Sequence, residues 1–133
     1  MTIVGKMAKN ILIVEDAETA ATTLEIALAN IPGVQVVRVN NGLSALEYLA
    51  GEAGPRVDAV VTDLEMPQLD GFELIRALRR QERFQLLPIV VISGAGDPKA
   101  PERARQLGAD AYFTKPWSPV AVRRKLEDLL SNS

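Results

Sequence analysis

Apolar residues are concentrated in five short runs, at residues 10–14, 34–39, 57–62, 88–92 and 110–114. The runs at 10–14 and 57–62 show no alternation of apolar and polar positions, which is typical of strands buried on both faces of a parallel sheet. The run at 34–39 partly alternates, as expected for a strand at the edge of a sheet. The pattern therefore predicts five strands, with residues 34–39 at an edge.

Between these runs the apolar residues recur at helical spacing. We expect helices at residues 17–31, 43–50 and 71–83, another between about 97 and 107, and a last one from 119 onward. Their inward positions are predicted to be Leu24, Leu28 and Ile31, then Leu43, Leu46, Tyr48 and Leu49, then Phe72, Leu74, Ile75 and Leu78, and finally Val122, Leu126 and Leu129. The basic residues Arg76, Arg79, Arg80, Arg123, Arg124 and Lys125 are expected to face solvent.

The fourth helix has an unusual start. Asp97 and Pro98 suit an N-cap and a first turn, but Pro101 has no N–H to donate. The helix is therefore expected to be short or to begin late, and Gly108 ends it.

Five strands alternating with five helices predict an α/β fold, a flavodoxin-like doubly wound (βα)5 unit with a five-stranded parallel sheet in the order 2-1-3-4-5. The length of 133 residues suits one domain. We expect residues 1–8 to be a disordered lead-in and residues 9–131 to form that domain.

The composition of the chain excludes several classes of binding site and catalytic mechanism. The 15 basic and 17 acidic residues give a net charge of −2, which argues against non-specific nucleic-acid binding. Cys and His are both absent, which excludes disulfides, thiolate zinc sites and imidazole catalysis. No apolar run approaches the ~20 residues that span a membrane, and the start is too weakly apolar for a signal peptide. The chain is expected to be intracellular.

Polar side chains follow the strands of the predicted sheet at one end: Glu15 and Asp16, Asp63, Ser93, and Lys115 after Thr114. Open α/β sheets place their chemistry at this edge. Carboxylates gathered there repel one another, and a hard divalent cation such as Mg2+ relieves that repulsion. The set suits phosphoryl transfer to an aspartate. Taken singly, each residue also fits an ordinary role as a loop cap, strand-end hydroxyl, solvated lysine or helix-capping acid.

Four segments together resemble the receiver domain of two-component response regulators, the CheY-like family. They are ILIVED at residues 11–16, VVTDLEMPQLDG at 60–71, PIVVIS at 88–93 and GADAYFTKP at 108–116. The resemblance covers residues 9–130. It implies that Asp63 is the phosphoacceptor and that Mg2+ is bound by Asp63, by Asp16 directly, by Glu15 through water and by the backbone carbonyl of Glu65. It further implies that Ser93 and Lys115 contact the phosphoryl group, that Ser93 and Tyr112 form the switch, and that the Lys115–Pro116 bond is cis.

The resemblance also implies a cytoplasmic bacterial phosphoprotein that acts in phosphorelay signal transduction and is not a classical enzyme, although it has intrinsic self-phosphorylation and autodephosphorylation activity. The phosphoryl donor is expected to be a histidine kinase or a histidine phosphotransfer protein. The signal would pass through the surface of the fourth helix, fifth strand and fifth helix to an output protein or domain. Direct contact with nucleic acid or membrane is not expected, and the protein is expected to be a monomer or a phosphorylation-dependent dimer.

Three alternatives remain at this point. A phosphatase with an aspartyl-phosphate intermediate would use Glu65 as its only nearby second carboxylate. A receiver-shaped scaffold would leave the acidic site unused. A flavin-binding protein of the same fold would need a phosphate-binding loop after the first strand, and the sequence has none. For Trp117, packing on the last helix is favoured over a contact with a partner.

Overall fold

Strands and helices alternate in the computed structural model, which describes residues 8–51, 56–94 and 96–131. The strands are β1 (Lys9–Val14), β2 (Val34–Val39), β3 (Ala59–Asp63), β4 (Ile89–Ser93) and β5 (Ala111–Thr114). The helices are α1 (Glu18–Ala29), α2 (Gly42–Ala50), α3 (Gly71–Arg79), α4 (Ala100–Leu107) and α5 (Pro119–Ser131), with a short 3-10 helix, η1 (Glu82–Phe84). The disordered lead-in expected at residues 1–8 lies outside the described residues except for Ala8.

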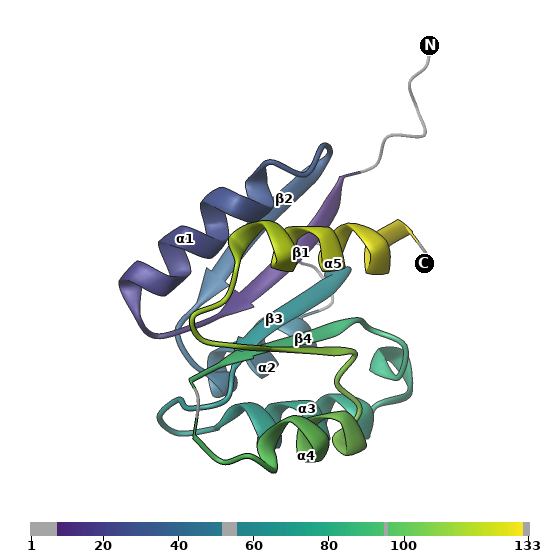
Figure 1. Cartoon of the computed structure of the whole chain (residues 1–133). Helices are drawn as coiled ribbons and strands as arrows, with labels where there is room; N and C mark the ends of the chain where they lie inside the picture. Colours follow the sequence, from purple (N-terminus) through teal and green to yellow (C-terminus); the bar gives the residue numbers. More distant parts are fainter. Residues whose placement is uncertain (1–7, 52–55, 95, 132–133) are drawn as a thin grey trace.

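The strands form one parallel sheet in the order β2-β1-β3-β4-β5, which confirms the predicted flavodoxin-like topology. Helices α1 and α5 cover one face, and α2, α3 and α4 cover the other (Figure 1). Strand β2 lies at an edge, as its partial alternation indicated. No helix in the described part of the chain is long and apolar enough to cross a membrane.

Two apolar clusters, one on each face, explain the unbroken run in β1. Leu12 and Val14 belong to the cluster under α2, α3 and α4, whereas Ile11 and Ile13 belong to the cluster under α1 and α5. Successive strand residues point to opposite faces, so a central strand needs apolar residues at every position.

The predicted solvent position of Arg79 is wrong. Its side chain is only 17% exposed, and α3 ends at Arg79 instead of continuing to residue 83. The guanidinium donates to the carbonyl of Gly108 from Nε at 3.1 Å and Nη2 at 2.7 Å, and to the carbonyl of Phe84 from Nη1 at 2.6 Å. It also pairs with Asp110 at 3.2 Å. Arg79 therefore ties the end of α3 to the turn between α4 and β5.

Two predicted inward positions also differ. Leu43 is 46% exposed, because α2 buries Gly42, Ala45 and Leu49 instead. In α5 the third deeply buried residue is Leu130, and Leu129 is only partly buried. In both helices the apolar residues occupy adjacent positions, and the pattern alone does not decide which of them points at the sheet.

Helix α4 begins late, as Pro101 suggested, but Asp97 is not its N-cap. The first helical residue is Ala100 and the cap position is Lys99. The carboxylate of Asp97 instead accepts the N–H of Lys99 at 2.9 Å. Pro101 lies in the first turn, where its missing N–H would have had no intrahelical partner.

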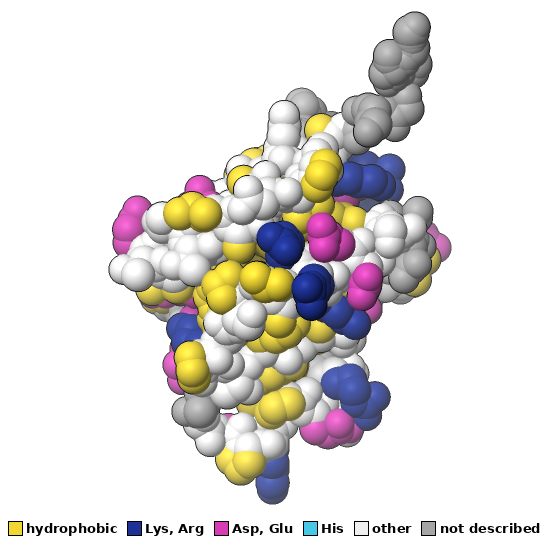
Figure 2. Space-filling view, turned by 45° about the horizontal axis from the view of Figure 1, so that its top comes forward, with side chains coloured by type: hydrophobic (Ala, Val, Ile, Leu, Met, Phe, Trp, Pro, Cys, Tyr) yellow, Lys and Arg dark blue, Asp and Glu magenta, His cyan; other side chains and the backbone are white. Residues whose placement is uncertain are grey.

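A groove of about 310 Å³ lies on the surface between α1 and α5, lined by Thr23, Ile26, Ala27, Asn30, Pro119, Val120 and Arg123. Figure 2 shows apolar side chains gathered near the middle of this face, with basic side chains beside them. Arg123 is half-buried, contrary to prediction, and its Nε finds no hydrogen-bond partner in the described part of the chain. Trp117 is also half-buried, against the cluster that contains Val122 and Leu126, which agrees with the expected packing.

Candidate functional site

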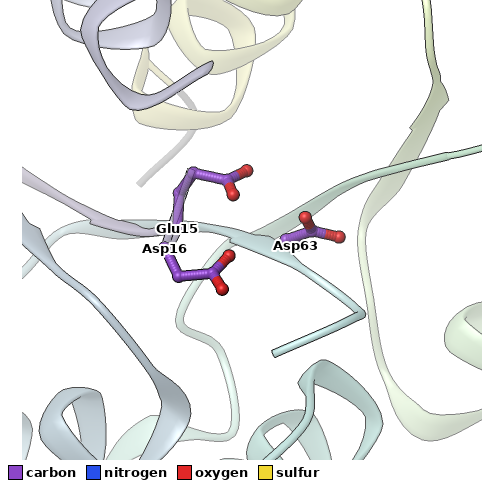
Figure 3. A group of neighbouring side chains, drawn as sticks. All are labelled: Glu15, Asp16 and Asp63. Atoms are coloured by element: carbon purple, nitrogen blue, oxygen red, sulfur yellow. The ribbon is translucent and has the colours of Figure 1, made fainter. Parts of the chain in front are cut away.

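Three carboxylates meet at the carboxyl ends of β1 and β3 (Figure 3). Asp63 is the last residue of β3, while Glu15 and Asp16 directly follow β1. One oxygen from each side chain lies within 4.8 Å of the others. Glu15 and Asp63 are buried and Asp16 is exposed, so the cluster has a closed side and a side open to solvent. The structure thus brings together the acidic residues that the sequence placed at strand ends.

The two oxygens of Asp63 have different surroundings. Oδ1 accepts the backbone N–H groups of Leu64 at 2.6 Å and of Glu65 at 3.1 Å. Oδ2 lies 3.7 Å from the ammonium of Lys115. The hydroxyl of Thr62 donates to the carbonyl of Asp63 at 2.8 Å, which also fixes the backbone. One carboxylate oxygen is therefore held by the following loop, and the other faces a cation.

Glu15 is completely buried, and its two carboxylate oxygens have different surroundings. Its Oε2 accepts the N–H of Ala17 at 3.0 Å, but Oε1 has no hydrogen-bond partner within the described residues. Burial is the main cause that raises the pKa of Glu15, and the nearby carboxylates of Asp63 and Asp16 raise it further. The N–H of Ala17 and the ammonium of Lys115 lower it in part.

Replacing Glu15 with glutamine is expected to stabilise the metal-free protein at neutral pH. The pKa of Glu15 is raised in the folded state. Ionisation of this carboxylate is therefore less favourable in the folded chain than in the unfolded chain, which lowers the free energy of unfolding. The destabilisation is complete at pH values above the raised pKa of the folded state. It disappears as the pH falls below that pKa toward the ordinary pKa of a glutamate. Melting in the presence of a chelator should therefore show a higher midpoint for E15Q at neutral pH, and the difference should shrink on acidification. A lower midpoint for E15Q at neutral pH would contradict this account.

The donor set fits a hard divalent cation. The oxygen of Glu15 that has no hydrogen-bond partner among the described residues lies beside two further carboxylates, so no donor balances its negative charge. Carboxylate oxygens are ligands that Mg2+ prefers. The three carboxylates would hold such a cation together with water, since their oxygens lie within 4.8 Å of one another. The exposed side of Asp16 gives such an ion access from solvent.

Ser93 and Lys115 reach the same edge through the pairing of β3, β4 and β5. Asp63 pairs with Ile92, the residue before Ser93, and Ser93 pairs with Thr114, the residue before Lys115. The N–H of Lys115 donates to the carbonyl of Ser93 at 2.7 Å. The Lys115–Pro116 bond is cis, as expected.

Tyr112 lies on the same face of the sheet as Ser93. It pairs with Val91, two residues before Ser93, and side chains two apart on a strand share a face. The ring is half-buried against the cluster under α3 and α4. It also lines a hollow of about 260 Å³ together with Pro101, Glu102 and Arg105 of α4. The structure therefore places Tyr112 between the end of β4 and the surface of α4.

Two residues near the site were not anticipated from the sequence. Arg38 of β2 donates from Nε to the carbonyl of Glu15 at 3.3 Å, and its only signal in the sequence is a basic residue within an apolar run. Gln68, in the loop after Asp63, has a positive φ of 71°, a conformation rare for residues other than glycine. The N–H of Leu69 donates to the carbonyl of Pro67 across it at 2.9 Å. The predicted role of the Glu65 carbonyl stays a prediction.

Comparison with known proteins agrees with this geometry. The response regulator receiver domain family matches residues 11–127. The chemotaxis protein CheY1 of Helicobacter pylori is 28% identical over 123 residues, which cover 92% of this chain and 98% of CheY1. The solved structure of the phosphorylated cyanobacterial phytochrome response regulator RcpA has a TM-score of 0.83 and 27% identity, and the match covers 95% of this chain and 96% of that one. The Mn2+-bound form of the response regulator Rcp1 has a TM-score of 0.75 and 26% identity, with coverage of 93% and 88%.

Proposed function

This chain belongs to the response regulator receiver family, and on that premise we propose that it acts in a phosphorelay by accepting a phosphoryl group on Asp63. One observation carries the assignment to this residue. Oδ2 of Asp63 is the carboxylate oxygen that faces Lys115 at 3.7 Å, beside two further carboxylates suited to a cation. The phosphorylated state of the related RcpA supports the same chemistry.

In the proposed reaction, Oδ2 of Asp63 attacks the phosphorus of the donor. A bond forms between this oxygen and phosphorus, the bond from phosphorus to the donor breaks, and the electron pair leaves with the donor. Lys115 offsets negative charge on the transferred oxygens, and the hydroxyl of Ser93 donates a hydrogen bond to one of them. Glu15, Asp16, Asp63 and the carbonyl of Glu65 would hold Mg2+, which supplies positive charge at the phosphoryl group when it is bound. The Mn2+-bound form of the related Rcp1 supports a divalent cation in this role.

Phosphorylation would change the conformation of two side chains, Ser93 and Tyr112. The new phosphoryl group adds charge and acceptor oxygens at Asp63, which draws the hydroxyl of Ser93 toward them. Space vacated on that face would let the ring of Tyr112 turn inward, away from the hollow beside α4. The surface of α4, β5 and α5 would change with it, and the shift can be only as large as the difference in stability that the phosphoryl group creates.

The donor is proposed to be a histidine kinase or a histidine phosphotransfer protein, and the receiver of the signal an output protein or domain that contacts α4, β5 and α5. We assign the whole activity to one domain over residues 9–131, since β1 begins at Lys9 and α5 ends at Ser131. Self-phosphorylation from small donors, slow loss of the phosphoryl group, a cytoplasmic location, and a monomer or phosphorylation-dependent dimer belong to the same proposal.

Incubation with Mg2+ and a small phosphoryl donor such as acetyl phosphate is expected to add one phosphoryl group to each chain. The intact mass should show this gain, and chelation of Mg2+ should prevent it because the carboxylates then repel the incoming phosphoryl group. An unmodified chain, or modification that ignores the chelator, would contradict the proposal. Release of many phosphates per chain from simple phosphate esters would indicate a phosphatase instead.

A further inference from the structure

Asp16 differs from the other two carboxylates of the acidic cluster in how it is held. Glu15 and Asp63 both accept backbone N–H groups. The carboxylate of Asp16 makes no hydrogen bond or ion pair with any residue that the structure describes, and it is exposed. Its position therefore depends on the backbone of the turn between β1 and α1.

That turn lacks the usual side-chain anchor. Strand β1 ends at Val14 and α1 begins at Glu18, and the N-cap residue, Ala17, makes no side-chain cap. A helix N-terminus normally gains stability from a polar N-cap side chain. The carboxylate of Glu15 accepts the N–H of Ala17 at 3.0 Å, which links the two chain neighbours of Asp16, and further contacts come from β2.

Arg38 holds both ends of this segment. Its Nε donates to the carbonyl of Glu15 at 3.3 Å, and its Nη1 pairs with Oε1 of Glu18 at 2.9 Å. Asp16 lies between Glu15 and Glu18 in the chain. The planar guanidinium offers several N–H donors in fixed directions, so one side chain can meet both acceptors at once.

Arg38 is itself firmly placed. It pairs with Ile13 in the sheet, and the carbonyl of the next residue, Val39, accepts the N–H of Glu15 at 3.1 Å. Its side chain is 17% exposed, in contrast to 81% for Glu18. Arg38 therefore connects the sheet to the turn through a largely buried guanidinium, which contacts the carbonyl of Glu15 and the exposed carboxylate of Glu18.

We propose that Arg38 is a positioning residue for the cation site, because it holds the turn that presents Asp16. The inference rests on the proposed function, in which Asp16 is a cation ligand. Residues that orient metal ligands from outside commonly change metal affinity about 10-fold or more when they are replaced. A purely electrostatic role makes the opposite prediction, since removing a positive charge near three carboxylates would strengthen cation binding.

The sign of the change in Mg2+ affinity tests this inference. Arg38→Met, which keeps most of the side-chain length, should weaken Mg2+ binding about 10-fold in titrations followed by backbone-amide NMR. Arg38→Lys keeps the charge and can reach only one of the two acceptors, so it should weaken binding by a smaller factor. Arg56→Met is the matched control, because Arg56 is an exposed arginine paired with Asp58 before the start of β3, at the other end of the sheet. Its Mg2+ affinity should equal that of the wild type.

Unchanged or tighter Mg2+ binding by folded R38M would overturn the inference while leaving the proposed function intact. Melting curves in chelator establish whether R38M is folded, and if it is not, wild-type affinity in R38K overturns the inference instead. A wild-type protein that binds no Mg2+ would contradict the proposed function itself, and the positioning role with it.

Discussion

Replacing Asp63 with asparagine is expected to eliminate the phosphoryl group that the wild-type chain gains from a small donor and Mg2+. The amide keeps the size of the side chain, and its oxygen can still accept the N–H groups of Leu64 and Glu65. Its nitrogen then takes the place of Oδ2 and has no lone pair suited to attack phosphorus. Intact-mass measurement should show no gain in D63N under conditions that modify the wild type completely.

Glu65→Gln is the matched control for Asp63→Asn. Its side chain is exposed, two residues beyond Asp63, and the substitution leaves the backbone carbonyl in place. This variant should still gain one phosphoryl group. A mass gain that persists in D63N would show that another residue accepts the phosphoryl group, and loss of the gain in E65Q would assign a direct role to that side chain.

Replacing Gly71 with alanine is expected to lower the free energy of unfolding by about 1–3 kcal/mol, the range for an added methyl group in a packed site. A Cβ at this position would collide with the carbonyl oxygen of Asp63 and would lie 2.8 Å from Cα of Leu64. Both are backbone atoms, which cannot turn aside as a side chain can. Urea denaturation should reveal the loss, and phosphorylation should slow because the strain falls on Asp63 itself.

Gly94→Ala provides the control for Gly71→Ala. Gly94 directly follows Ser93 at the same edge of the sheet, but apart from its chain neighbours a Cβ there would meet no atom of the described residues within 4 Å. Its free energy of unfolding should stay within about 0.5 kcal/mol of the wild type, the usual range for a substitution that disturbs no contact. If G71A were as stable as G94A, the close approach of α3 to the end of β3 would not restrict this position.

The conformation of this loop explains why β3 and α3 can approach so closely. The N–H of Gly71 donates to the carbonyl of Leu64 at 2.9 Å. Asp70 and Glu73 then form a capping box that starts α3. The loop is thus closed at both ends, and the backbone N–H groups that hold Oδ1 of Asp63 come from its first two residues. Packing at Gly71 and placement of the phosphoacceptor are therefore parts of one local structure.

Much of the fold follows from local pattern. The unbroken run at residues 57–62 indicated a central strand, and the structure buries Val60 and Val61 completely, on opposite faces of the sheet. Parallel strands align their carboxyl ends, so strand-end residues such as Glu15 and Asp63 could be expected to meet. Errors arose where adjacent apolar residues compete for the same helix face, as with Leu129 and Leu130.

The sequence by itself determined the alternation of strands and helices, the edge at which the acidic residues gather, and the residue types available for chemistry there. The tertiary structure decided which groups the terminal atoms of long side chains contact. Arg79 meets the carbonyl of Gly108 and Arg38 meets the carbonyl of Glu15, in each case across more than 20 residues of chain. It also decided that one oxygen of Asp63 faces Lys115 and that one oxygen of Glu15 has no hydrogen-bond partner among the described residues. Periodicity reports only the direction in which a side chain leaves the backbone, whereas the partner of its terminal atoms depends on segments that folding brings together.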